Sequence, residues 1–170
     1  AVTAKKGVGK STLIAFAARA LPFFTDDALR VDANLNCYGV PDVIKLHALL
    51  DSTPSHAIWS QRGDGKLFLR PKACGFILSS ADQALLRNLV FLHRSNVGRP
   101  QLSSIVTPKA KEILLLGSIV GASLLQQSVL LQAAASKVFS AVVQIDFFRL
   151  EEPDDLAAIA SSLDALRTIL

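Results

Sequence analysis

Several features that are common in chains of this length are missing from the sequence. It contains no Met, not even at position 1, although a chain of 170 residues normally has several. We therefore expect either a trimmed chain or one from which residues are missing. Cys37 and Cys74 are the only cysteines and show no C-x-x-C spacing. This excludes a disulfide framework and favours reduced thiols in a cytosolic protein.

Long apolar runs are absent as well. The longest, around residues 112–125, is interrupted by Gly117, Ser118, Gly121 and Ser123, so the sequence predicts no segment that spans a bilayer. No signal peptide is visible. Charged residues make up only 19% of the chain and hydrophobic residues 51%. This composition excludes a disordered chain and favours one domain with an apolar α/β interior.

Strand-like and helix-like segments alternate along the chain. Apolar runs predict strands at 1–4, 28–32, 66–70, 102–106, 112–117 and 138–147. Helical spacing and caps predict helices at 11–21, 40–50, 79–94, 122–137 and 152–170. Such alternation is typical of a mostly parallel sheet with helices on both faces. We therefore predict a single α/β domain over residues 1–170.

The first segment, "AVTAKKGVGKSTLIAFAARAL" (residues 1–21), has the pattern of a phosphate-binding loop that runs into a helix. In such loops backbone N–H groups surround an anion at the helix N-terminus, and glycines permit the close approach. Lys10 is the expected phosphate lysine, Ser11 the Mg²⁺ hydroxyl and Thr12 a hydroxyl near the α-phosphate. The predicted nucleotide contacts are Gly7, Val8, Gly9, Lys10, Ser11 and Thr12.

This loop and the alternation together predict a Rossmann-like P-loop NTPase fold, with the ligand at the carboxyl ends of the strands. Too few residues precede the loop for a full first strand. We therefore expect this strand to be truncated and the complete protein to have residues upstream.

The loop departs from the strict pattern G-x-x-x-x-G-K-[ST], because Ala4 stands where the first glycine would be. It resembles instead the loop K-G-G-x-G-K-[ST]-[ST] of the MinD/ParA family of P-loop ATPases. The resemblance implies an ATP- and Mg²⁺-dependent switch in which Lys5 reaches the nucleotide of a partner subunit. Lys6 replaces the second glycine of the family pattern. The later segments "LRVDANLNCYGVPDVIKLHALL", "SSIVTP" and "KEILLLGSIV" resemble the family's order of elements.

The carboxylates of the family are present only in part. The resemblance implies that Asp32, the first Asp of a D-x-D motif, lies at the magnesium site with Ser11; a turn at the end of a strand is the alternative for Asp32. Asn34 replaces the second Asp, and Thr107 stands where the Walker B Asp is expected. Asp146 is a weaker candidate for a metal-site carboxylate, and a turn or base-contacting role is preferred for it. With Lys5, Lys10 and Asp32 as catalytic residues, we predict slow or absent hydrolysis.

Three functions remain open. The first is an ATP-dependent switch of the MinD/ParA type, which dimerises with nucleotide, hydrolyses it slowly and positions or partitions a cellular cargo. The second is a hydrolysis-deficient scaffold or localisation protein on the same fold, for example of the pilus-localisation type. The third is a ligase resembling dethiobiotin synthetase, suggested by "VTAKKGVGKS" and "LRPKACG".

Basic residues accumulate between positions 62 and 111, where Asp64 and Asp82 are the only acidic residues. Such a region binds DNA or an acidic lipid face, or is simply solvated. The expected partners are ATP or ADP, a second copy of the chain, a protein activator and DNA. We expect a cytoplasmic protein that is recruited to a pole, a membrane surface or the nucleoid. His47, His56 and His93 lack metal-ligand spacing.

Overall fold

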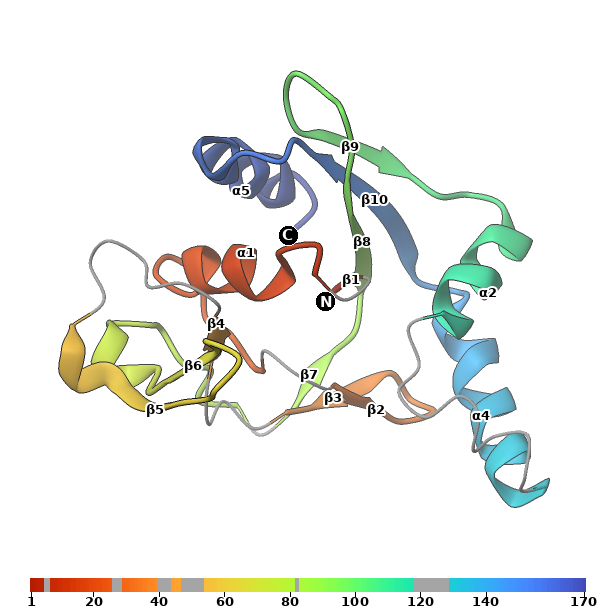
Figure 1. The fold of residues 1–170 in the computed structure, drawn as a ribbon. Helices are drawn as coiled ribbons and strands as arrows, with labels where there is room; N and C mark the ends of the chain where they lie inside the picture. Colours follow the sequence, from red (N-terminus) through yellow and green to blue (C-terminus); the bar gives the residue numbers. More distant parts are fainter. Residues whose placement is uncertain (5–6, 26–28, 40–43, 47–53, 82, 118–128) are drawn as a thin grey trace. The chain divides into compact units, whose positions relative to one another are not determined.

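The computed structural model describes residues 1–4, 7–25, 29–39, 44–46, 54–81, 83–117 and 129–170 (Figure 1). Internal contacts divide the chain into two compact units. The first unit consists of Ala1–Lys10, Val31–Cys37 and Ala84–Leu170, and the second consists of Ser11–Arg30 and Tyr38–Gln83. Each unit therefore combines segments that are distant in the sequence.

A four-stranded mixed sheet forms the centre of the first unit. β8 lies between β1 and β10 and is parallel to both, whereas β9 pairs antiparallel with β10 at the edge of the sheet. The uninterrupted run Leu89–Leu92 is buried, as expected for a strand with a neighbour on either side. In sheet order the strands are β1 (Val2–Ala4), β8 (Asn88–Arg94), β10 (Asp146–Glu152) and β9 (Gln101–Ser104).

The helices of the first unit lie in the sequence between β9 and β10 and after β10. Pro108 begins α2 at a position where its missing N–H costs nothing, and Asp155 accepts a hydrogen bond from the N–H of Ala157 at 2.9 Å to cap η3. The Nζ of Lys111 donates to the carbonyl of Ile145 at 2.8 Å. The helices are α2 (Pro108–Leu116), α4 (Val129–Val142), the 3₁₀ turn η3 (Leu156–Ala158) and α5 (Ile159–Arg167).

A third group of short strands forms a sheet in the order β2-β3-β7. β3 and β7 pair antiparallel, with Asn36 opposite Leu85 and Cys37 opposite Ala84. The strands are β2 (Arg30–Val31), β3 (Asn36–Tyr38) and β7 (Ala84–Leu85).

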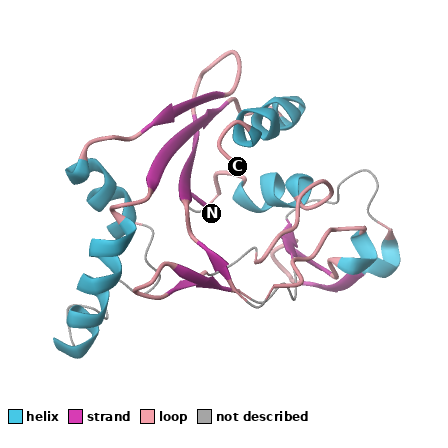
Figure 2. Cartoon of the chain, turned by 180° about the vertical axis from the view of Figure 1, so that it is seen from behind, coloured by secondary structure: helices cyan, strands magenta, loops and turns pink. Residues whose placement is uncertain are grey.

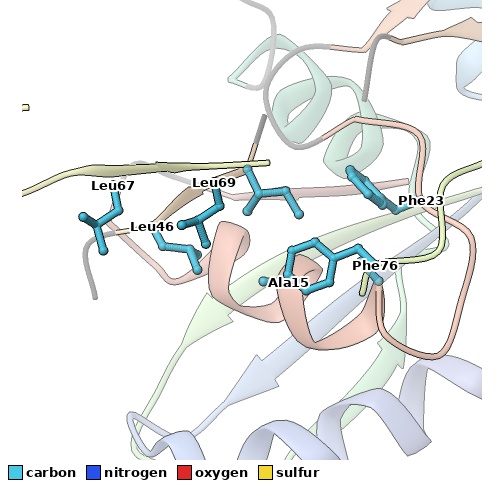
Figure 3. Packing of buried hydrophobic residues seen from close by; sticks show 8 residues of the cluster. Ala15, Phe23, Leu46, Leu67, Leu69 and Phe76 are labelled. Atoms are coloured by element: carbon cyan, nitrogen blue, oxygen red, sulfur yellow. The ribbon is translucent and has the colours of Figure 1, made fainter. Parts of the chain in front are cut away.

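The second unit packs helix α1 with a three-stranded antiparallel sheet of order β4-β6-β5, whose strands are magenta in Figure 2. Residues of β4 and β6 alternate between buried and partly buried positions, and the buried ones join one hydrophobic cluster (Figure 3). The rings of Phe23 and Phe76 pack edge to face in this cluster, with their centroids 6.4 Å apart. The elements are α1 (Lys10–Ala17), β4 (Ile44–Leu46), η1 (Ser55–Ala57), β5 (Ile58–Gln61), β6 (Leu67–Leu69) and η2 (Lys72–Cys74).

The predicted Rossmann-like P-loop fold, with a mostly parallel sheet and helices on both faces, is wrong. Parallel pairing joins β1 to β8 and β8 to β10, whereas the pairs β9–β10, β3–β7, β4–β6 and β5–β6 are antiparallel. The protein is a small mixed α/β protein with several short sheets. The prediction failed because the alternation of strands and helices, on which it depended, was assigned incorrectly in several segments.

Three predicted segments are assigned differently in the structure. The predicted helix 79–94 contains strands β7 and β8, because the leucine spacing of a helix also fits a run of apolar residues in a buried strand. The predicted strand 112–117 belongs mostly to helix α2. Here a short apolar run that also fits a buried strand forms part of a helix. In the predicted helix 40–50, residues 44–46 form β4, and residues 40–43 and 47–50 lie outside the described residues.

Other predicted elements are confirmed in part. β1, α1, β6 and α5 lie within the predicted segments 1–4, 11–21, 66–70 and 152–170, apart from Lys10, which opens α1. Within the described ranges, none of the helices has both the length and the hydropathy needed to cross a membrane.

Candidate functional site

The segment between β1 and α1 contains the glycines of the predicted phosphate loop. Gly7 has φ 87° and Gly9 has φ 96°, values that residues with a side chain rarely adopt. α1 begins at Lys10, directly after Gly9. A strand, a glycine turn and a helix therefore follow one another, which is the local arrangement of an anion-binding loop. Lys5 and Lys6 lie outside the described residues.

The predicted nucleotide contacts, residues 7–12, are divided between the two units. Gly7, Val8, Gly9 and Lys10 belong to the first unit, and Val8, Gly9 and Lys10 are partly buried there. Ser11 and Thr12 are the second and third residues of α1 and open the second unit.

Gly9 is required for two separate reasons, whereas Gly7 is required for one. A Cβ atom on Gly9 would lie 2.6 Å from the Nη2 of Arg94, far inside van der Waals contact. A Cβ on Gly7 would meet no atom of the described residues within 4 Å. Backbone conformation thus disfavours a side chain at both glycines, and a side chain at Gly9 would in addition displace the guanidinium of Arg94.

Arg94 holds the loop from the carboxyl end of β8, the strand next to β1. Its Nε donates to the carbonyl oxygen of Val8 at 2.9 Å. Its Nη1 donates to the carbonyl of Pro153 and lies 3.2 Å from the Oε2 of Glu152. Asp154 is 3.9 Å from Nε, but its side chain is 95% exposed, so this pair contributes little.

Glu152 completes a network from the loop to helix α5. Its side chain is fully buried at the end of β10, and its Oε1 accepts a hydrogen bond of 2.6 Å from the Oγ of Ser162. Within the described part of the chain Oε2 has no partner with hydrogen-bond geometry, yet it lies within ion-pair distance of Arg94. A buried carboxylate without a cation is costly, so Glu152 requires Arg94 to stay in place.

Asp32 is engaged in its own turn. One carboxylate oxygen accepts the N–H groups of Asn34 and Asn36, each at 2.9 Å, and the other accepts the side-chain amide of Asn36 at 3.0 Å. Leu35 has a positive φ of 64° in the same turn. These contacts correspond to the alternative interpretation of Asp32 as a turn residue at the end of a strand. The magnesium-site role of Asp32 stays a prediction.

The strand order separates the other predicted carboxylate positions from the loop. The predicted Walker B segment begins with the last two residues of β9, Ser103 and Ser104, and β9 lies at the sheet edge beyond β10. Thr107 is the exposed N-cap residue of α2 and makes no capping hydrogen bond with its side chain. Asp146 is the first residue of β10, whereas the loop follows the carboxyl end of the parallel strand β1. Asp146 therefore lies at the opposite end of the sheet from the loop, and its weaker assignment to a metal site stays a prediction.

The two cysteines are free; Cys37 is buried and Cys74 is partly buried. Burial raises the pKa of the Cys37 thiol above its usual value; the positive charge of the N-terminus partly opposes this shift, and the charge of Asp32 adds to it. Burial also raises the pKa of the Cys74 thiol, which the charge of Arg19 partly opposes. Neither thiol has the lowered pKa of a reactive nucleophile.

The structure brings together no set of three or more His, Cys, Asp or Glu side chains that could hold a metal ion, as far as the described residues extend. His56 and His93 are exposed, and His47 lies outside the described residues. A magnesium ion bound through phosphates and the hydroxyl of Ser11 needs no such set.

Some of the basic residues between 62 and 111 make internal contacts. Arg94 pairs with Glu152, and the Nζ of Lys111 lies 5.1 Å from the ring centroid of Phe147. The guanidinium of Arg62 lies 5.7 Å from the ring centroid of Phe68. The region is also divided, since residues up to 83 belong to the second unit and residues from 84 to the first. The DNA-binding role of this region stays a prediction.

Sequence reasoning missed Arg94, Glu152 and Ser162. The available signal was a charged residue at the end of each of two segments that contain apolar residues, "NLVFLHR" and "DFFRLEE". Their pairing depends on β8 and β10 being neighbours, which the sequence does not reveal. Comparisons of the chain with protein-family models, with curated proteins and with solved structures found no match.

Proposed function

We propose that the segment from Gly7 to Thr12 binds the phosphates of ATP together with Mg²⁺, and that the bound nucleotide is hydrolysed slowly or not at all. The observation that carries this proposal is the pair of positive φ values at Gly7 and Gly9 immediately before Lys10, the first residue of α1. Glycines in this conformation let successive backbone N–H groups gather around one anion.

The side chains that follow the glycines fit a triphosphate. Lys10 supplies a positive charge at the position from which a loop lysine reaches the β- and γ-phosphates. Ser11 and Thr12 add hydroxyls in the first turn of α1, and a serine hydroxyl is a ligand that Mg²⁺ accepts. The partial positive charge at the start of a helix favours the same anion.

Weak hydrolysis is supported by the surroundings of the candidate catalytic residues. Phosphoryl transfer requires a group that orients the attacking water. The carboxylate of Asp32 already accepts three hydrogen bonds from Asn34 and Asn36. The strand beside β1 ends in Arg94 instead of an acidic residue. These observations favour a nucleotide-binding scaffold or switch over a fast ATPase.

Calorimetric titration of Mg·ATP into the purified chain tests binding. We expect micromolar affinity, which Lys10→Ala weakens roughly tenfold or more because the charge-assisted contact with the phosphates is lost. Lys109→Ala is the matched control, since Lys109 is exposed on α2. Equal affinity in wild type and Lys10→Ala, or no binding by the wild type, would contradict the proposal.

Release of inorganic phosphate tests turnover. We expect a turnover rate far below ~1 s⁻¹, which is the lower end of the typical range of kcat values for enzymes. Asn34→Asp restores the second Asp of the family motif and is expected to raise the rate if Asp32 and residue 34 serve the attacking water. Turnover of the wild type at an ordinary enzymatic rate would contradict the weak-hydrolysis part of the proposal.

The resemblance to the MinD/ParA family supports further partners, which we propose on that basis. Nucleotide-dependent dimerisation is measured by light scattering with and without Mg·ATP, and Lys5→Ala is expected to abolish it. Stimulation of turnover by duplex DNA tests the basic region between residues 62 and 111. If neither dimerisation nor stimulation is observed, the switch hypothesis is rejected and the scaffold hypothesis is kept.

A further inference from the structure

We infer that Arg94 is the positioning residue of the phosphate loop: its guanidinium fixes the Val8–Gly9 peptide so that the N–H of Gly9 faces the bound phosphate. The inference rests on the proposed function, because a positioned loop matters only where an anion binds. It assigns a role to a residue on β8 that is distant in sequence from the loop.

The orientation of one peptide group is the first step. The carbonyl oxygen of Val8 accepts a hydrogen bond of 2.9 Å from the Nε of Arg94. In a planar trans peptide the carbonyl and the following N–H point in opposite directions. Because Arg94 holds the Val8 carbonyl on its own side, the N–H of Gly9 is directed to the other side. A carbonyl turned the other way would present its negative end to a phosphate and withdraw this donor.

The second step is that Arg94 is itself held in place. Its Nη1 donates to the carbonyl of Pro153 and pairs with the Oε2 of the fully buried Glu152 at 3.2 Å. The other oxygen of Glu152 is fixed by Ser162 at 2.6 Å. A planar guanidinium that is held at Nη1 has little freedom at Nε. The network therefore determines the direction of the hydrogen bond to Val8.

The third step explains why Gly9 has no side chain. A Cβ there would lie 2.6 Å from the Nη2 of Arg94, so any larger residue displaces the guanidinium. The close packing of Gly9 against Arg94 thus belongs to the same device as the hydrogen bond to Val8. Since Glu152 balances its charge, Arg94 acts as a fixed hydrogen-bond donor to the loop.

Two measurements test the inference on the full chain. The first records the amide ¹⁵N–¹H resonance of Gly9 in the ligand-free protein, which reports the state of the peptide independently of any nucleotide. The second titrates Mg·ATP and inorganic tripolyphosphate by calorimetry. The variants are Arg94→Gln and Arg94→Lys, and the control is Arg167→Gln, which loses only an exposed pair with Asp164. Thermal melting shows which variants are folded.

We expect Arg94→Lys to melt cooperatively, because the ammonium still balances Glu152, but to lose the fork geometry that also reaches Val8. Its Gly9 amide resonance shifts, and its affinity for both ligands falls roughly tenfold or more. Arg94→Gln shows the same loss, and Arg167→Gln binds as the wild type does. If Arg94→Gln does not fold, Arg94→Lys alone decides.

Unchanged affinity and an unchanged Gly9 resonance in a folded Arg94 variant would overturn the inference and leave the proposed function standing. If the wild type binds neither ATP nor tripolyphosphate, the proposed function fails and the role of Arg94 in phosphate binding fails with it. In that case a Gly9 resonance that shifts in Arg94→Lys identifies Arg94 as a purely structural support of the loop.

Discussion

At the residue scale, the two loop glycines meet different physical demands. Both have a positive φ, but a side chain has free space at Gly7 and collides with Arg94 at Gly9. The two positions therefore separate the cost of backbone strain from the cost of a close contact. Strain at a positive φ costs about 1–2 kcal/mol for an ordinary residue.

Alanine at each glycine tests this separation. We expect Gly7→Ala to lower the free energy of unfolding by about 1–2 kcal/mol, the cost of strain alone. Gly9→Ala is expected to add about 1–3 kcal/mol of overpacking and to weaken Mg·ATP binding more than Gly7→Ala does. Urea unfolding and calorimetry measure the two effects. Gly98→Ala is the control, since Gly98 has open space and an ordinary φ. Equal losses at Gly7 and Gly9 would mean that Arg94 moves freely.

Cys37 provides a prediction on pH. Its pKa in the folded chain lies above its usual value, first because the thiol is buried. The unfolded chain therefore releases this proton at lower pH than the folded chain does. The contribution to stability is complete below the usual pKa of about 8.5 and is lost as pH rises from there through the folded pKa. We expect Cys37→Ala to flatten the fall of unfolding free energy with pH above this value, measured by urea titration. A parallel fall in both proteins would contradict the prediction.

At the element scale, β8 and β10 determine how the first unit is built. The two strands are parallel to each other, β8 is also parallel to β1, and each of them ends in a charged residue. The stacked rings of Phe91 and Phe147, with centroids 5.6 Å apart, join the two strands. The charged ends place Arg94 and Glu152 side by side at the edge where the loop leaves β1.

Shortening one buried side chain of β10 measures how much this packing stabilises the fold. Leu150 is fully buried, and we expect Leu150→Ala to lower the free energy of unfolding by about 2–5 kcal/mol through lost burial and a cavity. Leu156→Ala removes the same atoms from a side chain that is 65% exposed, so its effect should stay within about 0.5 kcal/mol. Urea unfolding compares the two. Similar values would show that β10 is not part of the stable core.

At the scale of the whole molecule, ligand binding and stability are linked. A ligand that binds only the folded chain stabilises it by about 2.7 kcal/mol at a hundredfold excess over its Kd. For a chain of this size we expect an increase in Tm of about 5–10 °C with saturating Mg·ATP. Differential scanning calorimetry measures this shift, and Lys10→Ala, which binds roughly tenfold more weakly or worse, should show about half of it or less at the same ligand concentration. A shift of equal size in Lys10→Ala would place the nucleotide elsewhere on the chain.

Much of the local structure could be predicted from the sequence because it depends on neighbouring residues. The glycines, Lys10 and the apolar helix after them predicted a strand, a turn and a helix, and the structure places β1, two positive φ values and α1 there. The turn of Asp32 is local too, since its carboxylate bonds to Asn34 and Asn36. The short apolar runs were ambiguous, because burial and not spacing decides whether they form strands or helices.

The sequence by itself therefore determined the loop between β1 and α1 and the candidates for phosphate contact, since backbone conformation and charge there follow from adjacent residues. Only the tertiary structure decided which strand lies beside β1, that β9 is an antiparallel edge strand and that Arg94 reaches Val8. Strand order joins residues that are far apart in the chain, and it results from burial of apolar surface over the whole unit. A short stretch of sequence therefore cannot specify the strand order.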